Sequence, residues 1–371
     1  MSPAAAKQVR VVAVAGARPN FVKIAALLRE LESRPGFDVS LVHTGQHYDE
    51  AMSKNFFRDL GIREPDLNLE VGSASHGAMT GQILEKMERV LQEDPPDVVT
   101  VVGDVNSTVA ASLAAVKLQI PVAHVEAGLR SFDRTMPEEI NRLLTDAISD
   151  WLFVTEPAGR DNLLNEGVPA EKIHFVGNTM IDTLLTHVER ARTRPVLEDL
   201  GLEPAEYAVL TLHRPSNVDD PGRLRDLFDV LEEIHSELPV VFPTHPRTAA
   251  ALEGALGGHE PRLRMLPPLG YLDFLRLMAD SRLVLTDSGG IQEETTALGV
   301  PCLTLRANTE RPVTVTHGTN RIVGTDPTAI REEVRKILQG DRQEGAVPEL
   351  WDGHAAARIA DVLERELGEA N

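Results

Sequence analysis

The chain has 371 residues, of which 37 are lysine or arginine and 57 are aspartate or glutamate, so its formal net charge is −20. This length suits two domains, and so acidic a surface would repel nucleic-acid phosphates, so we expect no nucleic-acid partner. The single cysteine, Cys302, excludes an internal disulfide framework and favours a reducing compartment. It lies in the apolar run VPCLTL, where we expect a buried strand residue and not a reactive thiol.

The first residues, MSPAAAKQVRVVAVAGA, have the basic start, short apolar run and small residues of a secretory signal. The run continues at once into RPNFVKIAALLREL, however, which predicts a strand, a turn and a helix of a folded domain. No apolar stretch approaches the roughly 20 residues that a membrane span needs. We therefore expect a cytoplasmic protein with no membrane partner.

Short apolar runs rich in β-branched residues alternate with amphipathic stretches along the chain. The runs predict strands of parallel sheets covered on both faces; they are VRVVAVAG, DVSLVHTG, DVVTVVGD, PVAHVEAG, WLFVTE, IHFVGN, YAVLTLHR, PVVFPTH, LVLTDSGG and PCLTL. Two amphipathic stretches carry apolar residues at i, i+3, i+4 and i+7, which predicts helices whose apolar stripe faces the core. These stripes are Phe21, Ile24, Ala25 and Leu28, and Ile140, Leu143, Leu144 and Ala147.

This alternation predicts an α/β fold of two Rossmann-like, doubly wound parallel-sheet domains facing a cleft. The polar stretch HVERARTRPVLEDLGLEPAE holds two prolines and precedes a new strand at Tyr207, so we expect the hinge between about residues 178 and 205. The expected domains are residues 1–180 and 181–354. A C-terminal helix at 355–371 could belong to either domain, and it could pack back on the first domain.

The first candidate anion site is AGARPNFVK, at the carboxyl end of the first strand. Gly16 permits a tight turn, and Pro19 suits the first turn of a helix whose N-terminal N–H groups attract anions. Arg18 and Lys23 add positive charge. Doubly wound folds bind ligands at such strand ends, so we favour an anion contact over a plain strand–helix connection with solvated side chains.

Two carboxylates end consecutive strands in the first half. Asp104 ends the strand of TVVGDVNSTVAA, where it also competes with Asn106 and Ser107 for the role of helix N-cap. Glu126 ends the strand of PVAHVEAGLRS, where partial desolvation suits proton transfer, unless the carboxylate simply pairs with Arg130. Because both acids end consecutive strands, they are candidates for one catalytic cleft.

The stretch RSFDRTMPEEINR predicts the start of a helix. Thr135 and Glu138 match a T-x-x-E capping box, and Pro137 suits the first helical turn. Glu138 and Arg142 are one turn apart and lie opposite the stripe that begins at Ile140, so we expect both to face away from the core. On this pattern alone, the stretch is a well-capped surface helix with an ion pair.

The second half repeats the pattern of polar residues at strand ends. TLHRPSNVDD ends a strand with His213 and Arg214, where the histidine can donate to a phosphate or act as an acid near neutral pH. PTHPRT places His245 and Arg247 at the next strand end as secondary candidates. A lone histidine is more often structural, but an arginine beside a strand-end histidine favours an anionic ligand.

The strongest local signal is LTDSGGIQEETTALGVP. Ser288, Gly289 and Gly290 open a helix, so a phosphate can approach its backbone N–H groups and positive dipole. The motif is neither a Walker A loop nor a dinucleotide fingerprint, so it implies neither ATP nor NAD. Glu294 lies one turn into the helix and suits hydrogen bonds from ribose hydroxyls, and Arg311 in ANTERPVT could reach a phosphate.

The sequence favours a sugar nucleotide and no resident cofactor. No histidines or cysteines are paired at metal-ligand spacing, and Glu138, Glu139 and Asp133 do not by themselves require Mg²⁺, so we expect no metal. Serine-hydrolase and redox-cysteine motifs are also lacking in the sequence. A phosphate and ribose cradle in one domain, with several carboxylates in the other, fits a nucleotide whose sugar lies between the two.

Eight motifs occur in this order: GARPNFVK, TGQHYDEAMS, GDVNST, HVEAGLRSFDRTMPEEINR, GNTMIDTL, HRPSNVDD, LTDSGGIQEE and NTERPVT. Together they resemble the non-hydrolysing UDP-N-acetylglucosamine 2-epimerases over nearly the whole chain. The resemblance implies a GT-B-type pair of Rossmann-like domains, a homodimer, and neither metal nor nicotinamide. It also implies reversible conversion of UDP-GlcNAc to UDP-ManNAc, in which UDP is eliminated to give 2-acetamidoglucal and then added back.

The resemblance also assigns roles to residues. It matches Asp104, Glu126 and Glu138 to the family's acid–base carboxylates. It matches His213 to the histidine that assists the leaving diphosphate, and it leaves Glu139 as an ordinary helix-start residue. Residues matched to substrate and UDP binding are Arg18, Lys23, Arg142, Ser288, Gly289, Gly290, Glu294 and Arg311. Residues similar to a second, regulatory UDP-GlcNAc site are Gln46, His47, Arg214 and His245.

The chain departs from the family pattern at Pro215, where many members have arginine, and within TGQHYDEAM. Both departures touch the regulatory site, so we do not expect allosteric activation. Relatives that act on other UDP-2-acetamido sugars share much of the pattern, so an epimerase of such a sugar is an alternative. A GT-B glycosyltransferase and a non-catalytic UDP-sugar-binding protein are further alternatives, and three carboxylates in the first domain argue against the glycosyltransferase.

Overall fold

The structure is a computed structural model that describes residues 8–45, 56–244, 246–256, 261–341 and 345–368. Its internal contacts divide the chain into two compact units, residues 1–185 with 349–371 and residues 186–348. From the sequence we expect the boundaries at 180 and 354, whereas the contacts place them after Leu185 and after Pro348.

The first unit is built on a seven-stranded parallel sheet with the strand order β3-β2-β1-β4-β5-β6-β7. The order reverses between β1 and β4, so the carboxyl ends of these strands form the switch point at which doubly wound folds bind ligands. Val99, Val101 and Val122 fill its central strands because helices bury both faces. The strands are β1 (Val9–Ala15), β2 (Phe37–His43), β3 (Leu67–Asn68), β4 (Val98–Val102), β5 (Val122–Ala127), β6 (Trp151–Val154) and β7 (Ile173–Phe175).

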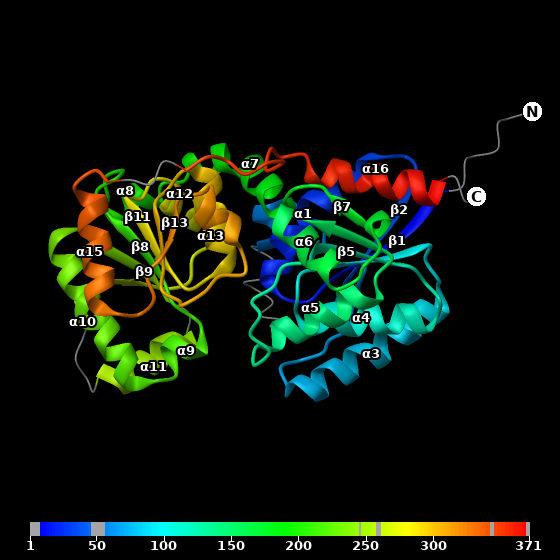
Figure 1. The fold of residues 1–371 in the computed structure, drawn as a ribbon, viewed down its shortest axis with the longest axis horizontal. Helices are drawn as coiled ribbons and strands as arrows, with labels where there is room; N and C mark the ends of the chain where they lie inside the picture. Colours follow the sequence, from blue (N-terminus) through cyan, green and yellow to red (C-terminus); the bar gives the residue numbers. More distant parts are fainter. Residues whose placement is uncertain (1–7, 46–55, 245, 257–260, 342–344, 369–371) are drawn as a thin grey trace, which may run out of the picture. The chain divides into compact units, whose positions relative to one another are not determined.

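Helices cover both faces of this sheet (Figure 1). The helices α3, α4 and α5 lie on one face, and the apolar side of α3, with Ile83 and Met87, packs there with the alanines of α4. The helices α1 and α16 pack against each other on the other face. The helices of this unit are α1 (Arg18–Ser33), α3 (His76–Glu93), α4 (Asn106–Lys117), α5 (Pro137–Ile148), α6 (Pro157–Asn165), the start of α7 (Thr179–Arg192) and α16 (Ala355–Gly368).

The second unit repeats this plan with a six-stranded parallel sheet of order β10-β9-β8-β11-β12-β13, which reverses between β8 and β11. Leu227 and Phe228 of α10 and Ile330 of α15 belong to its core. The strands are β8 (Ala208–Thr211), β9 (Val240–Pro243), β10 (Arg264–Leu266), β11 (Leu283–Thr286), β12 (Cys302–Thr304) and β13 (Asn320–Ile322). The helices are α8 (Val196–Leu200), α9 (Pro215–Val218), α10 (Pro221–Glu237), α11 (Pro246–Leu256), α12 (Tyr271–Ala279), α13 (Gly289–Leu298), α14 (Pro312–Thr316) and α15 (Pro327–Leu338).

The predicted fold class, α/β with two doubly wound parallel sheets, is confirmed. Every apolar run predicted as a strand forms one. Cys302 is fully buried in β12, as expected, and burial raises the pKa of its thiol to about 12. The sequence pattern misses β3, β10 and β13, because their residues, LN, RML and NRI, form no run of β-branched apolar residues.

The polar stretch expected to act as the hinge is largely helical. The helix α7 runs through its first half because Ile181, Leu184 and Val188 form a buried apolar stripe at i, i+3 and i+7. The boundary between the two units, after Leu185, therefore falls inside a helix and not in an irregular linker.

The helix α5 has the opposite orientation to the one its sequence predicts. Leu144 is 52% exposed, Ala147 is exposed, and Ile140 and Leu143 are only half-buried, so the apolar stripe faces solvent in the described chain. The buried residues of α5 are polar: Glu139, Arg142, Thr145 and Asp146. The predictions that the stripe faces the core and that Arg142 faces away from it are therefore wrong.

The predicted capping box is also wrong. The helix begins at Pro137 after Met136, and no side chain caps its N-terminus. Thr135 lies outside the helix and donates its hydroxyl to Asp133. Both errors have one physical cause, because the start and the inward face of α5 are set by charged partners elsewhere in the fold and not by local preferences.

Candidate functional site

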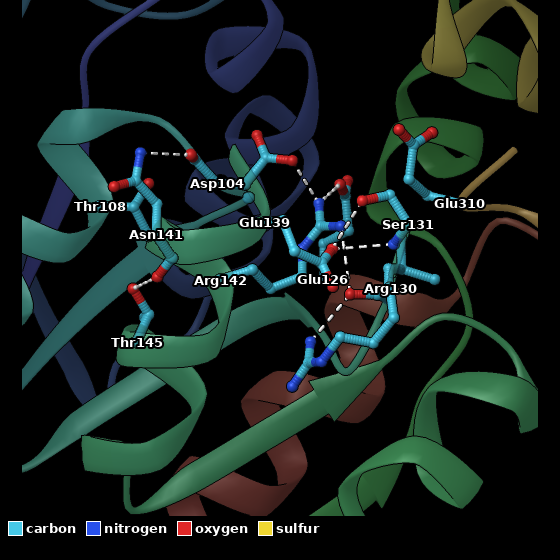
Figure 2. Close-up of polar contacts among 12 residues, drawn as sticks. Asp104, Thr108, Glu126, Arg130, Ser131, Glu139, Asn141, Arg142, Thr145 and Glu310 are labelled. Carbon is cyan, nitrogen blue, oxygen red and sulfur yellow. Dashed lines mark hydrogen bonds and ion pairs between the residues drawn. The ribbon is translucent and has the colours of Figure 1, made fainter. Parts of the chain in front are cut away.

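The polar stripe of α5 lies at the carboxyl ends of β4 and β5, where it meets two of the predicted acids (Figure 2). The Arg142 guanidinium is 1% exposed and lies 2.5 Å from Asp104 Oδ2 and 3.3 Å from Glu126 Oε1. Lys23 Nζ, on α1, lies 2.5 Å from Glu126 Oε2. The structure thus brings four predicted site residues together at the switch point of the first sheet.

This cluster pairs two cations with two carboxylates in a nearly dry environment. The Glu126 side chain is 2% exposed and that of Asp104 is 24% exposed. An unpaired buried carboxylate costs several kcal/mol, so the ion pairs with Lys23 and Arg142 offset the cost of burying these acids. Arg130, the alternative partner of Glu126, instead binds Asp146 and Glu166.

The backbone beneath both acids has a left-handed conformation. Gly103, just before Asp104, has φ 69°, and Glu126 itself has φ 68° at a bulge in the pairing of β5 with β6. This φ is unfavourable for glutamate, and such strain concentrates at functional sites. A bulge re-aims a side chain out of the regular alternation of a strand, so the local fold directs Glu126 into the cluster.

The two adjacent acids at the start of α5 have different environments. Glu138 is half-buried one turn before Arg142, so it lies on the same side of the helix as Arg142. Glu139 is 3% exposed, and its carboxylate accepts hydrogen bonds from Ser131 N–H at 2.8 Å, Ser131 Oγ at 2.9 Å and Phe132 N–H at 3.2 Å. The expectation that Glu139 is an ordinary helix-start residue is wrong. Its carboxylate holds the turn that precedes α5.

The connection from β1 to α1 is fastened by Asn20. Its Oδ1 accepts from Ala17 N–H at 3.0 Å, and its Nδ2 donates to the Val102 carbonyl at 2.9 Å, which ties the start of α1 to the end of β4. The helix begins at Arg18, as the sequence predicts, and Lys23 follows one turn later. The side chain of Arg18 lies outside the described part of the structure.

In the second unit, His213 and Asp287 follow the two strands of the switch point. Fully buried Asp287 accepts from His213 Nδ1 at 2.9 Å, from the backbone N–H of Arg214 at 2.9 Å and from Asn217 Nδ2 at 3.1 Å. Burial opposes ionisation of Asp287, but the donors from His213 and Arg214 hold its pKa below the ordinary value. Asp287 thereby orients a histidine whose side chain is 53% exposed. Asp287 is not among the predicted site residues, although it ends a strand as Asp104 does.

The helix α13 opens directly after β11, as predicted. Ser288 is its N-cap residue, and the serine side chain makes no capping hydrogen bond. Gly289 permits a close approach, because a Cβ there would lie 2.5 Å from Arg311 Nη1. Arg311 Nε lies 2.8 Å from Glu293 Oε2. The first turn, which also contains Gly290, therefore combines the N–H groups of a helix start with an arginine held beside them.

Glu294 lies one turn into α13 and is buried. Its Oε1 accepts from the Tyr271 hydroxyl at 3.4 Å. Burial, assisted by the neighbouring Glu293 carboxylate, raises the pKa of Glu294 to about 8. Near neutral pH this carboxyl is therefore largely protonated, so it can both donate and accept hydrogen bonds.

Three of the four predicted regulatory residues, Gln46, His47 and His245, lie outside the described residues. The fourth, Arg214, lies 3.7 Å from Glu310, whose carboxylate also binds Arg306. Among the residues that the structure describes, no group of three or more His, Cys, Asp or Glu side chains is arranged to hold a metal ion. None of the described helices is both long and apolar enough to cross a membrane.

Comparison with known proteins shows the family. A family model described as UDP-N-acetylglucosamine 2-epimerase matches residues 29–364. A UDP-N-acetylglucosamine 2-epimerase of Methanococcus maripaludis is 43% identical over 338 residues, which cover 89% of this chain and 92% of the relative. A UDP-2,3-diacetamido-2,3-dideoxy-D-glucuronate 2-epimerase of Pseudomonas aeruginosa is 43% identical over 363 residues, which cover 95% of this chain and 99% of the relative.

A solved structure leads to the same family. The crystal structure of Methanocaldococcus jannaschii UDP-GlcNAc 2-epimerase in complex with UDP-GlcNAc and UDP matches 96% of this chain and 100% of that chain, with a TM-score of 0.88 and 40% identity. The family match and the relatives together span nearly the whole sequence and both Rossmann-like units. The chain therefore belongs to the UDP-N-acetylglucosamine 2-epimerase family.

Proposed function

We propose that this protein interconverts UDP-GlcNAc and UDP-ManNAc by reversible epimerisation at C2, through elimination and re-addition of UDP. The observation that carries the proposal is the buried cluster in which Lys23 and Arg142 hold Asp104 and Glu126 at the switch point of the first sheet. Family membership supports the reaction, and the names of the relatives support a UDP-linked acetamido sugar as substrate.

The chemistry requires several groups to act together. A carboxylate takes the C2 proton, the C2–H electron pair forms the C1–C2 double bond, and the C1–O bond breaks with its electrons leaving on the diphosphate of UDP. That diphosphate oxygen then adds back to C1, and C2 is reprotonated from the opposite face. The C2 proton is weakly acidic, so both a positioned base and a stabilised leaving group are needed.

Two faces of one carbon require two proton-transfer groups, and three acids meet this need. We propose Asp104, Glu126 and Glu138 as the catalytic carboxylates. Lys23 and Arg142 support this role because they hold the first two acids in place. Glu138 contributes from the start of α5, one turn before Arg142.

We assign UDP to the second unit. The diphosphate fits the start of α13 at Ser288, Gly289 and Gly290, beside Arg311, because helix N–H groups and a guanidinium both bind phosphate. His213, held by Asp287, is then placed to donate to the departing diphosphate. Other assigned contacts are a ribose hydroxyl on the protonated carboxyl of Glu294 and a phosphate on Arg18. The assignment requires the two units to face one cleft in the GT-B manner.

Proton NMR of the enzyme with UDP-GlcNAc in D₂O tests the proposal directly. We expect UDP-ManNAc to appear, with deuterium at C2 of both sugars and no need for an acceptor. Asp104→Asn, Glu126→Gln and Glu138→Gln should each fold and lose turnover, whereas Glu253→Gln, an exposed acid on α11, should behave as wild type. Full activity in all three carboxylate variants would sink the assignment. Binding of UDP without exchange would indicate a sensor, and dependence on an acceptor a glycosyltransferase.

One observation supports a second sugar as an alternative substrate. The P. aeruginosa relative named for UDP-2,3-diacetamido-2,3-dideoxy-D-glucuronate is 43% identical to this chain, as is the M. maripaludis relative named for UDP-N-acetylglucosamine. Overall identity therefore does not select between the two sugars. The same NMR assay with each sugar, compared by kcat/KM, decides which is the substrate.

We also propose that the protein is a cytoplasmic homodimer. The outward stripe of α5, formed by Ile140, Leu143, Leu144 and Ala147, is an apolar surface that a second copy would cover. The single, buried cysteine suits a reducing compartment. The stripe lies on the helix whose opposite side holds the cluster, so dimer contacts would also support the site.

A further inference from the structure

A second buried polar network lies behind the acidic cluster. His124, on β5, and Asp146, on α5, are 0% and 2% exposed. His124 Nδ1 lies 2.7 Å from Asp146 Oδ1, and His124 Nε2 lies 2.8 Å from the Gly103 carbonyl oxygen. Neither residue has a role in the reaction proposed above.

The partners of His124 determine its protonation state. A carboxylate oxygen and a backbone carbonyl oxygen can only accept hydrogen bonds, so both ring nitrogens must donate. His124 is therefore an imidazolium in this arrangement, and its charge is balanced by Asp146. Burial opposes ionisation of Asp146, but His124 and Arg130 outweigh it and hold the pKa of Asp146 below its ordinary value.

The network holds in place the two backbone turns that carry the proposed catalytic acids. The carbonyl that His124 binds belongs to Gly103, which has φ 69° and immediately precedes Asp104. The second oxygen of Asp146 accepts from the N–H of Gly128 at 3.1 Å, just beyond Glu126. One imidazolium–carboxylate pair therefore fixes the end of β4 and the end of β5 relative to each other.

We propose that His124 is a positioning residue for the epimerisation: it holds the Gly103 turn so that Asp104 and Glu126 keep the relative placement that proton transfer at C2 requires. The proposal rests on the proposed function. His124 acts only through the backbone, because it is fully buried and its ring contacts Gly103 and Asp146. A misplacement of about 1 Å can cost up to about 100-fold in rate, so this hydrogen bond should act mainly on kcat.

Two substitutions separate the two hydrogen bonds of the ring. The glutamine amide nitrogen reaches about as far as Nε2, so His124→Gln can keep the bond to Gly103 and lose the one to Asp146. The asparagine nitrogen reaches about as far as Nδ1, so His124→Asn can keep Asp146 and lose Gly103. We expect His124→Asn to lower kcat by about 10-fold or more with KM within about 3-fold of wild type, and His124→Gln to retain most of kcat.

The matched control is His174→Gln, because His174 also lies on a strand of the first sheet, β7, away from the acidic cluster. It should leave kcat and KM unchanged. Thermal unfolding of all three variants reports stability separately. Equal losses of kcat in both His124 variants, in proportion to their loss of stability, would mean a merely structural role and overturn the proposal, as would unchanged kcat in His124→Asn.

An NMR measurement on the wild-type protein tests the inference without relying on any variant. In wild-type protein with ¹⁵N-labelled histidine, Nε2 of His124 should give the chemical shift of a protonated nitrogen that donates a hydrogen bond, and an unprotonated Nε2 would overturn the inference. Wild-type turnover separates failure of the proposed function from failure of the positioning role. No epimerisation of either UDP-sugar by wild type means that the proposed function fails, whereas normal wild-type turnover with a fully active His124→Asn means that only the positioning role fails.

Discussion

Glu294 is a carboxyl group whose surroundings oppose its ionisation. Its folded-state pKa is about 8 against an ordinary value of 4.5, so the folded protein keeps a proton that the unfolded chain releases. The stability that this proton supplies is complete below pH 4.5 and is lost as pH rises toward 8. In the wild-type protein, the free energy of unfolding should therefore fall by a few kcal/mol across this pH window. The Glu294→Gln variant should not show this fall.

Urea unfolding at pH 5, 7 and 9 measures this effect. Titrations elsewhere in the protein are common to wild type and variant, so they cancel in the difference. Glu253→Gln, at an exposed position on α11, should track wild type at every pH. Parallel pH profiles for wild type and Glu294→Gln would show that Glu294 ionises normally.

Asp287 should matter to turnover although it is fully buried. Asp287→Asn removes the negative charge that orients and supports His213, so we expect kcat to fall on the order of 100-fold if His213 assists the leaving diphosphate. Steady-state kinetics of Asp287→Asn, His213→Ala and the double variant provide the measurement. The double variant should lose little more than His213→Ala alone. Additive losses would place the effect of Asp287 outside His213.

Three of the site residues predicted from sequence share one visible property, which is a polar position directly after an apolar run. Asp104, Glu126 and His213 all carry this signal, and the fold places them at switch points. Their supporting partners do not carry it. His124 lies within an apolar strand, and Asp146 lies in the middle of a helix 22 residues away, so only the tertiary fold shows that they are paired.

At the scale of elements, the outward stripe of α5 makes a testable surface. Leu144→Glu places a charge on a residue that is 52% exposed, so it should leave the folded subunit intact but prevent a second copy from covering the stripe. Light scattering coupled to size-exclusion chromatography should report a dimer for wild type and a monomer for the variant. Leu164→Glu, on α6 and 39% exposed, is the matched control. A wild-type monomer, or a Leu144→Glu dimer, would contradict the assignment of this face.

Most elements were predictable because parallel strands covered on both faces have continuous apolar runs. The helix α5 shows where this reasoning fails. An apolar stripe predicts which face a helix buries only when the core it meets is apolar, whereas α5 meets strand ends lined with charged groups. Glu139, Arg142 and Asp146 recur at i, i+3 and i+7, so a polar stripe of helical period was present in the sequence and had a structural meaning.

At the scale of the whole molecule, the chain returns to the first unit at residues 349–371. This return segment should determine the stability of the first unit. Trp351 is 1% exposed and donates to the Thr155 carbonyl at 2.9 Å, and the Asp182 carboxylate accepts from the Ala356 N–H at 2.8 Å at the start of α16. Removing residues 349–371 uncovers α1 and costs about 1.5–3 kcal/mol for each buried apolar side chain lost, against a typical total stability of about 5–15 kcal/mol.

We expect calorimetry of this truncated chain to show an unfolded or strongly destabilised first unit beside a second unit that melts near its wild-type temperature. A chain ending at Gly368 keeps α16 and should melt as wild type does. Wild-type melting of the shorter chain would mean that the return segment contributes little.

The fold class follows from alternation along the entire sequence, a signal that survives local errors, and so it was predictable. The division into units was less so, since a helix spans the boundary after Leu185 and the chain re-enters the first unit at residue 349. From the sequence, the C-terminal helix could belong to either domain, because the buried contacts of Trp351 involve residues far earlier in the chain, such as Thr155 at 196 residues' separation.

The inward stripe of α5 should also make the docking of this helix selective during folding. A helix that docks by hydrophobicity can settle on any apolar surface, but α5 gains little until the ends of β4 and β5 present Asp104, Glu126 and Gly128 in the right positions. Buried charges without their full set of partners are unfavourable. The helix α5 should therefore not pack stably when β4 or β5 has the wrong register. The chain should thus gain the buried contacts of α5 only in the conformation that also brings Asp104 and Glu126 together.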